Sequence, residues 1–255
     1  MSSFSKGDFM ITYGNKEISF SFGVPWGITI GNFTKQVNDI STEKEDAVPQ
    51  KEDAEMSLLI AIKRENYAIL MSESRAVFRR VENGKEILTL KSDTCRKIIQ
   101  IGNHMIGFTG LYDFAEGYIE DILGTSLLPD DPPATAFHKI MLLHQQLQPQ
   151  LIHTKLDLTY AGTDGRNVLV RCISGNSQEQ NMVTLHADQY IGTGISFAPD
   201  DYLLPLDSDQ AADIAFAKNF LEKEISVHQK YERFSMIGGP LQGYLLDKNG
   251  VKKIF

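Results

Sequence analysis

Cysteine and long apolar runs are both scarce in this chain of 255 residues. Cys95 and Cys172 are its two cysteines, too few to form a disulfide framework. The first residues carry no apolar segment of the kind that directs secretion, and no apolar run approaches the roughly 18 residues of a membrane-spanning helix. These absences predict a protein of the reducing cytoplasm that has no membrane partner.

Basic charge and cofactor motifs are also in short supply. The chain has 25 Lys and Arg against 33 Asp and Glu, a formal net charge of −8, and no local basic cluster, so nucleic acid is not an expected partner. The six histidines are scattered without the spacing of metal ligands, and no dinucleotide-binding or phosphate-binding glycine motif is present. We therefore expect neither a metal nor an organic cofactor.

An acidic segment divides the chain into two unequal parts. Residues 41–56 hold six carboxylates and two lysines with few apolar groups, which is typical of a solvated linker. The segment separates a leader, residues 1–40, from residues 57–255. The leader contains a hairpin signal, with strand-like runs at 9–13 and 18–22, but is too small to fold alone. We expect the leader to be a pro-segment or an arm that docks on residues 57–255.

Apolar runs joined by short polar turns predict antiparallel strands in the larger part. The predicted strands span 57–63, 67–71, 97–101, 104–108, 156–162 and 168–173, with a closing hairpin of 241–246 and 251–255. Helical spacing predicts helices over 111–122, 136–147 and 208–228, the last capped by Ser208. Together these elements predict an α+β fold with two antiparallel sheets face to face and helices on their outer surfaces.

A succession of short motifs runs along the same part of the chain. Residues 57–76 read SLLIAIKRENYAILMSESRA, and Lys97 then begins the next predicted strand. Later come Ile106-Gly-Phe-Thr-Gly, Tyr160-Ala-Gly-Thr-Asp-Gly, Ile191-Gly-Thr-Gly and the pair Gly238-Gly239. In this order the motifs of residues 57–255 resemble those of proteasome-type N-terminal nucleophile hydrolases, the group that includes proteasome subunits and HslV-like peptidases.

The resemblance implies a four-layer αββα sandwich, two antiparallel sheets between layers of helices, whose first strand starts with the nucleophile. In active members of the family the nucleophilic residue becomes the first residue of the chain by self-cleavage, and its own α-amine then acts as general base. A free α-amine has a pKa of about 8, so it can accept the hydroxyl proton near neutrality. The amide nitrogen of an uncut chain cannot, because it has no basic lone pair.

Four residues of this sequence fall on the functional positions of the family. Ser57 matches the N-terminal nucleophile, and Lys97 matches the lysine whose positive charge lies beside it. Glu73 matches the carboxylate that pairs with this lysine, and Gly110 matches the glycine whose backbone N–H helps to form the oxyanion hole. The sequence departs from the usual pattern in having Ser rather than Thr as nucleophile, Met56 rather than Gly before it, and Glu rather than Asp at position 73.

Two functions are compatible with this resemblance. The first is a peptide or amide hydrolase subunit, in which removal of residues 1–56 exposes Ser57 to peptide or unfolded-protein substrates. The second is a non-catalytic ring or scaffold subunit, in which the leader is retained and Ser57 is an ordinary residue at the start of a strand. In both, the resemblance implies assembly into a homo-oligomeric ring and leaves room for an ATPase partner.

Overall fold

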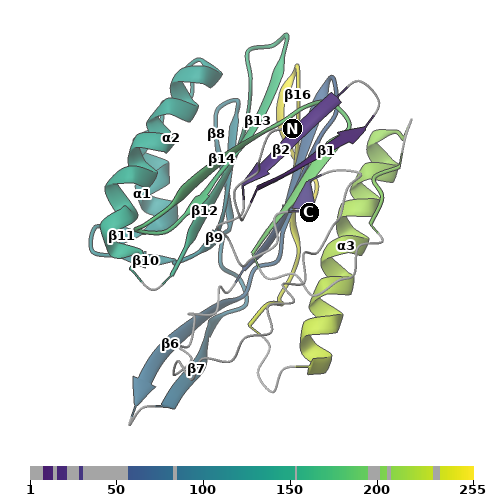
Figure 1. Ribbon diagram of the computed structural model, residues 1–255. Helices are drawn as coiled ribbons and strands as arrows, with labels where there is room; N and C mark the ends of the chain where they lie inside the picture. Colours follow the sequence, from purple (N-terminus) through teal and green to yellow (C-terminus); the bar gives the residue numbers. More distant parts are fainter. Residues whose placement is uncertain are drawn as a thin grey trace.

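Two antiparallel sheets and three α-helices make up the fold in the computed structural model (Figure 1). The structure describes residues 8–13, 16–21, 29–30, 57–82, 85–152, 154–194, 202–205, 208–231 and 236–255. The acidic linker predicted at 41–56 lies outside these residues. No helix among them is long and apolar enough to cross a membrane.

The first sheet has five strands in the order β14-β13-β12-β9-β8. Its strands are β14 (Gln180–Leu185), β13 (Val168–Gly175), β12 (Leu156–Thr163), β9 (His104–Gly110) and β8 (Ile98–Ile101). Every pairing in the sheet is antiparallel. Helices α1 (Ile119–Ser126) and α2 (Pro133–Leu147), the latter followed by a 3-10 turn at Gln148–Gln150, share one buried apolar cluster with β9 and β12 of this sheet.

The second sheet has five strands in the order β17-β16-β5-β4-β15, and the two-residue strand β3 (Thr29–Ile30) of the leader pairs with its β15 edge. The five are β17 (Gly250–Lys253), β16 (Gln242–Asp247), β5 (Tyr67–Ser72), β4 (Leu58–Lys63) and β15 (Gln189–Gly194), all paired antiparallel. Helix α3 (Gln210–Tyr231) packs on this sheet through a second buried cluster.

The sequence of β4 explains how it fits between two packing partners. All six of its residues are buried, so it reads as a continuous apolar run rather than as an alternating one. Leu58, Ile60 and Ile62 belong to the cluster shared with α3, whereas Leu59 and Ala61 belong to a third cluster that takes side chains from both sheets. A Cβ on Gly107 of β9 would lie 2.1 Å from Leu59 Cδ1, so the glycine lets the leucine side chain approach the first sheet.

Much of the predicted secondary structure is confirmed. The α+β class, the two antiparallel sheets and the strand pairs β4–β5, β8–β9, β12–β13 and β16–β17 all agree with the sequence patterns. The leader hairpin is present as β1 (Asp8–Tyr13) and β2 (Lys16–Ser21). The helix predicted at 136–147 is α2, and the one predicted at 208–228 is α3.

Two details of the predicted helices are wrong. The segment 111–118 is not helical, because it forms the short strands β10 (Asp113–Phe114) and β11 (Gly117–Tyr118), and α1 begins only at Ile119. Gly117 has φ +128°, far from helical values, and the Ile119 N–H donates to Tyr112 O at 3.0 Å across the turn. Ser208 does not cap α3 either, since the Ala212 N–H donates to Asp209 Oδ1 at 2.8 Å and the Ser208 hydroxyl donates to Asp213.

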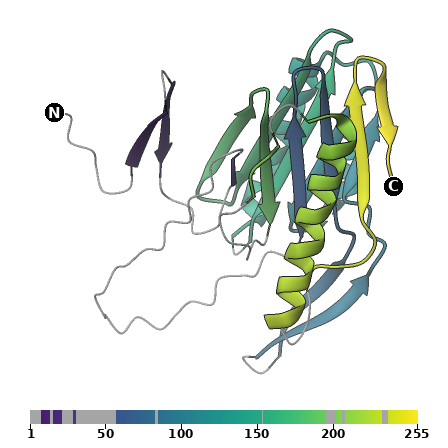
Figure 2. The same ribbon diagram turned by 90° about the vertical axis from the view of Figure 1, so that its right-hand side faces the viewer.

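Besides β3, β10 and β11, four strands were not predicted. Strands β14 and β15 complete the two sheets, and β6 (Ala76–Glu82) pairs with β7 (Lys85–Ser92) in a two-stranded ribbon that extends away from both sheets (Figures 1 and 2). In the sequence this ribbon lies between β5, which Glu73 directly follows, and β8, which Lys97 directly precedes. The ribbon therefore lengthens the chain between two candidate site residues without separating them in space.

Candidate functional site

The Glu73 carboxylate lies at the centre of a buried cluster of hydrogen bonds. Glu73 directly follows β5, where the strand passes β4, and it is fully buried. Its Oε1 accepts the Leu58 N–H at 3.1 Å, and its Oε2 accepts the N–H groups of Arg75 at 2.6 Å and Gly238 at 3.1 Å. Hydrogen bonds of this kind fix the orientation of the carboxylate.

Lys97 supplies the positive charge that pairs with this carboxylate. Its Nζ donates to Glu73 Oε1, and the side chain is 2% exposed. An ammonium group has three N–H donors, and within the described residues Glu73 is the one side chain or backbone group that accepts from it. Among the described residues, one of the three donors of this buried ammonium is thus engaged.

Ser57 immediately precedes this cluster in the chain. Its carbonyl carbon is bonded to the Leu58 nitrogen, and the Leu58 N–H and the Lys97 ammonium donate to the same oxygen of Glu73. Ser57 is 3% exposed. Gly194 at the end of β15 passes close above it, with φ +95°, and a Cβ there would lie 1.7 Å from Ser57 O. A side chain at position 194 would therefore displace the start of β4.

Gly110 lies at the end of β9 in a conformation that favours glycine. Its φ is +100°, and a Cβ there would lie 2.1 Å from Lys155 O. The Leu111 N–H donates to the same carbonyl at 2.9 Å. The backbone of Lys155 comes so close that position 110 has no room for a side chain, which explains why a glycine is found there. The structure thus pairs Glu73 with Lys97 at the start of β4, directly after Ser57 in the chain, while the nucleophile role of Ser57 and the oxyanion role of Gly110 stay predictions.

Three chain segments meet around Glu73 and hold it in place. The N–H groups of Ser74 and Arg75 donate to Gly238 O at 3.1 and 3.0 Å, and the Cys95 N–H donates to Ser74 O at 2.8 Å. The Arg75 guanidinium also forms an ion pair with Asp93 at 2.6 Å, which raises the pKa of Arg75 and lowers that of Asp93. The segment after β5, the segment before β8 and the segment before β16 are thus joined in one cluster by these contacts.

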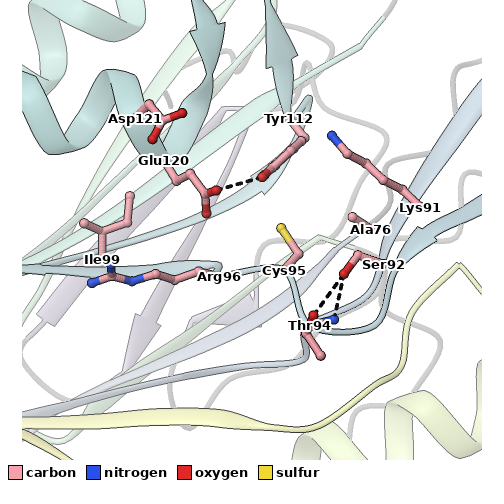
Figure 3. Close-up of a pocket in the computed structure, with 10 residues that line it drawn as sticks. All are labelled: Ala76, Lys91, Ser92, Thr94, Cys95, Arg96, Ile99, Tyr112, Glu120 and Asp121. Atoms are coloured by element: carbon pink, nitrogen blue, oxygen red, sulfur yellow. Dashed lines mark hydrogen bonds between the residues drawn. The ribbon is translucent and has the colours of Figure 1, made fainter.

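A pocket of about 370 Å³ opens beside this cluster (Figure 3). It is lined by residues from β6, β7, the segment before β8, β8 itself, the segment between β9 and β10, and α1: Ala76, Lys91, Ser92, Thr94, Cys95, Arg96, Ile99, Tyr112, Glu120 and Asp121. Because Cys95 and Arg96 directly precede Lys97, one wall of the pocket and the candidate site belong to the same stretch of chain.

Polar and charged groups of both signs lie on the wall of this pocket. The Tyr112 hydroxyl donates to Glu120 Oε1 at 3.0 Å, and the Lys91 ammonium lies 4.2 Å from the centroid of the Tyr112 ring. Burial raises the pKa of the Cys95 thiol, although the nearby Lys97 charge opposes this. The thiol is therefore a neutral, weakly polar part of the wall rather than a reactive thiolate.

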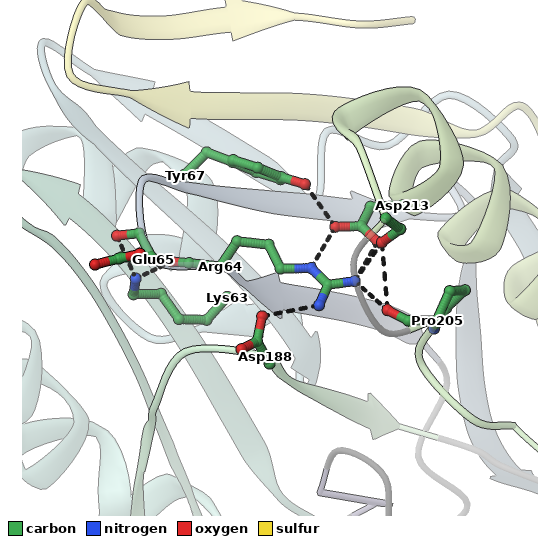
Figure 4. A network of polar contacts seen from close by, with 8 residues as sticks. Lys63, Arg64, Glu65, Tyr67, Asp188, Pro205 and Asp213 are labelled. Carbon is green, nitrogen blue, oxygen red and sulfur yellow. Dashed lines mark hydrogen bonds and ion pairs between the residues drawn. The ribbon is translucent and has the colours of Figure 1, made fainter.

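A second buried cluster of charges lies at the opposite end of β4 (Figure 4). The Arg64 guanidinium forms two hydrogen bonds with Asp213 of α3, each 2.7 Å long, and others with Asp188 at 2.9 Å, Pro205 O at 2.6 Å and the Ser208 hydroxyl. The Tyr67 hydroxyl donates to Asp213 Oδ2 at 2.7 Å. Every donor nitrogen of Arg64 has a partner, so this cluster ties α3 to the β4–β5 turn and leaves nothing to bind a ligand.

Metal binding finds no support in the described residues, which contain no group of three or more His, Cys, Asp or Glu side chains arranged to hold an ion. Comparison with known proteins adds no family to this picture. A scan against protein-family models finds no match for the chain, and a search of curated proteins finds none either.

The sequence patterns overlooked several groups that the structure places around Glu73. Backbone N–H groups from Leu58 and Gly238 carry no sequence signal, because any residue could provide them. Gln242, whose side chain contacts the backbone before β8, lies in a predicted strand and was interpreted only as part of it. The motif around Gly238 did give a signal, since a Gly-Gly pair before a strand marks an unusual backbone.

Proposed function

We propose that the chain is a proteasome-type N-terminal nucleophile hydrolase subunit, in which Ser57 attacks a peptide or amide bond after residues 1–56 are removed. One observation carries the proposal: a single oxygen of the buried Glu73 accepts both the Leu58 N–H and the Lys97 ammonium. This fixes the residue after the candidate nucleophile and the candidate cation to the same atom. A buried ammonium held close to the start of β4 would stabilise negative charge that develops on the Ser57 oxygen.

The arrangement of layers is consistent with the fold that the family has. Helices α1 and α2 pack on one sheet, α3 packs on the other, and a cluster with side chains from both sheets lies between them. In Figure 1 the helices accordingly lie at the two sides of the strands. A four-layer αββα sandwich is the arrangement we propose. In it Ser57 starts a central strand, and its surroundings come from both sheets.

The proposed reaction uses groups of this chain alone. The free α-amine of Ser57 takes the proton of the hydroxyl as Oγ bonds to the substrate carbonyl carbon, and the C–N bond then breaks as the leaving amine receives that proton. The resulting ester of Ser57 is attacked by water, which gives one proton back through the same amine and releases a carboxylic acid. The Lys97 charge lowers the cost of the developing alkoxide, and Glu73 holds that charge in place.

The pocket beside the cluster is suited to hold part of a peptide substrate. Its volume of about 370 Å³ suits a side chain, and its wall includes Arg96 and Glu120, charges of opposite sign. Peptides or unfolded proteins are therefore the substrate class we propose. The same proposal includes assembly into a homo-oligomeric ring, which would confine such substrates near the site. It also includes an ATPase partner.

A second candidate function is favoured by one contact of the leader. The two residues of β3 pair with Ile191 and Gly192 at the edge of β15, directly beside β4. A leader that stays docked in this way is what a non-catalytic ring or scaffold subunit would have. In that protein the Glu73–Lys97 pair would be structural, and Ser57 would keep its peptide bond to Met56.

N-terminal sequencing and covalent labelling distinguish the two candidates. The purified chain is expected to yield a species that begins at Ser57, and this species is expected to react with a peptide epoxyketone, whose two electrophilic carbons bond to a hydroxyl and an α-amine of one residue. Peptide mapping should place the adduct on Ser57. Ser57→Ala should abolish it, and Ser126→Ala, a serine on α1, should not.

A chain that remains full length and unlabelled would support the scaffold function instead. To separate lack of processing from lack of activity, a chain with a specific protease site placed before Ser57 provides the new N-terminus directly. If this trimmed, folded chain also fails to react, the hydrolase proposal is wrong.

A further inference from the structure

We infer that Gln242 is a positioning residue for Lys97, an inference that rests on the proposed function. Gln242 is the first residue of β16, and its backbone pairs with Ser72 of β5, the residue before Glu73. Its side-chain amide forms two hydrogen bonds with the segment before β8. Oε1 accepts the Lys97 N–H at 3.2 Å, and Nε2 donates to Cys95 O.

These two hydrogen bonds replace a missing strand partner. Residues 94–97 are not part of a strand, because β8 begins at Ile98. On one side of this segment the Phe108 N–H of β9 donates to Lys97 O at 3.1 Å. On the other side the Gln242 amide presents one acceptor and one donor, as the backbone of a neighbouring strand would. The Lys97 backbone is therefore held between β9 of the first sheet and β16 of the second.

This location matters because the Glu73–Lys97 ion pair connects the two sheets. Glu73 follows β5 of the second sheet, whereas Lys97 precedes β8 of the first. The lysine side chain has four flexible carbons, so the ammonium is only as well placed as the backbone that carries it. Gln242 fixes that backbone relative to β5 and so relative to Glu73. Both backbone groups that it contacts belong to buried residues, Cys95 and Lys97, and buried backbone groups are normally hydrogen-bonded, so loss of the half-buried amide is expected to be costly.

Two substitutions separate positioning from simple packing. Gln242→Met keeps the approximate size and removes both hydrogen bonds. Gln242→Glu keeps the acceptor for the Lys97 N–H, but its ionised carboxylate cannot donate to Cys95 O, whereas the protonated acid can. The matched control is Gln150→Met, because the Gln150 Oε1 likewise accepts a backbone N–H, that of Ala115, at 2.8 Å and far from Glu73 in the sequence.

The first measurement is the rate of epoxyketone labelling of the chain that begins at Ser57. Gln242→Met is expected to lower the maximal inactivation rate roughly 10- to 100-fold, the effect of a misplaced catalytic group, with little change in probe affinity. Gln242→Glu is expected to be slow at neutral pH and to recover relative to wild type as the pH falls and the acid becomes protonated. Gln242→Met should stay slow at every pH, and Gln150→Met should match wild type.

The second measurement does not depend on activity. Backbone hydrogen exchange of the Lys97 amide, followed by NMR, should accelerate at least tenfold in Gln242→Met and remain unchanged in Gln150→Met. Unchanged exchange at Lys97 in Gln242→Met would overturn the inference whatever the activity. Faster exchange with a normal labelling rate would also overturn it, because the amide would then be structural only. If exchange accelerates in Gln242→Met but even the wild type is never labelled, the inference that Gln242 positions Lys97 stands and the proposed hydrolase function is wrong.

Discussion

The two ends of β4 carry buried ion pairs of different construction. At the end of β4 that Arg64 follows, the Arg64 guanidinium donates to five acceptor atoms, two of them on Asp213. At the near end the Lys97 ammonium meets one acceptor among the described residues, Glu73 Oε1, although Glu73 itself is bound by three backbone N–H groups. The two pairs thus differ at the cation: among the described residues every nitrogen of the Arg64 guanidinium has an acceptor, whereas the Lys97 ammonium has one acceptor for its three donors.

This difference indicates what each pair does. A planar guanidinium with every nitrogen engaged orients its surroundings and has no capacity for a ligand, so the Arg64 cluster joins α3 to the second sheet. A carboxylate held by three backbone N–H groups instead fixes the position of the Lys97 charge, and among the described residues it is the one acceptor of that ammonium. Such a charge can act on a neighbouring hydroxyl, which is the role proposed for Lys97 beside Ser57.

The largest expected loss of stability comes from replacing Arg64. Arg64→Met leaves the Asp213 carboxylate buried and without its cation, so we expect a loss of about 3–5 kcal/mol in the free energy of unfolding. Denaturation by urea at pH 7 would measure it. The control is Lys218→Met, which removes only an exposed i,i+4 pair with Glu222 and should cost about 0.5 kcal/mol or less. Equal losses in the two variants would show that the Arg64 cluster is not the main link to α3.

Replacing Lys97 is expected to lower stability less than replacing Arg64, but to abolish epoxyketone labelling. Lys97→Met leaves Glu73 with its three N–H donors, so we expect a loss of about 1–3 kcal/mol, less than for Arg64→Met. Labelling of the trimmed chain by the epoxyketone should nevertheless fall below detection, whereas a trimmed Arg64→Met chain that remains folded should still react. If Lys97→Met reacts at the wild-type rate, the contrast between the two pairs has no functional meaning.

The smallest expected effect concerns pH. Burial alone would raise the pKa of Asp213, but hydrogen bonds from Arg64, Ser208 and Tyr67 outweigh it and lower the pKa below its usual value. A lowered pKa in the folded state gives stability that is present above the unfolded pKa of about 3.9 and is lost as the pH falls through the folded pKa.

Tyr67→Phe removes one of these donors and should therefore cost about 1 kcal/mol at pH 7, because the charged carboxylate loses a hydrogen bond. The difference from wild type should disappear at pH values low enough to protonate Asp213. Urea denaturation across the acid range would test it. A difference that is constant with pH would mean that Tyr67 stabilises the fold by packing rather than through the carboxylate.

Most strands could be predicted because their sequences are locally unambiguous. The run Leu58–Lys63 and its partner Tyr67–Ser72 are apolar and separated by a short polar turn, so both strands and their antiparallel pairing follow from the sequence. The segment 111–118 misled the prediction because its apolar residues also have helical spacing. Gly117, with φ +128°, decides the outcome, and that angle reflects the turn into α1 rather than the residue type alone.

Part of the candidate site could also be anticipated. The resemblance in motif order points to Ser57, Glu73 and Lys97, and Glu73 and Lys97 do form an ion pair although 24 positions and the ribbon β6–β7 separate them. Ser57 lies next to this pair through the chain, because the N–H of the following residue, Leu58, donates to Glu73. The hydrogen bond between the Gln242 side chain and the Lys97 backbone could not be anticipated. The two residues are 145 positions apart, and no sequence pattern shows which backbone a glutamine at the start of a strand contacts.

The sequence by itself determined most of the local elements, among them the strand pairs β4–β5, β8–β9, β12–β13 and β16–β17 and the helices α2 and α3. These properties depend on neighbours within a few residues, where spacing and turn chemistry decide. Only the tertiary structure decided that one oxygen of Glu73 receives both the start of β4 and the ammonium of Lys97. That meeting depends on how the two sheets pack, which is a property of the whole buried core.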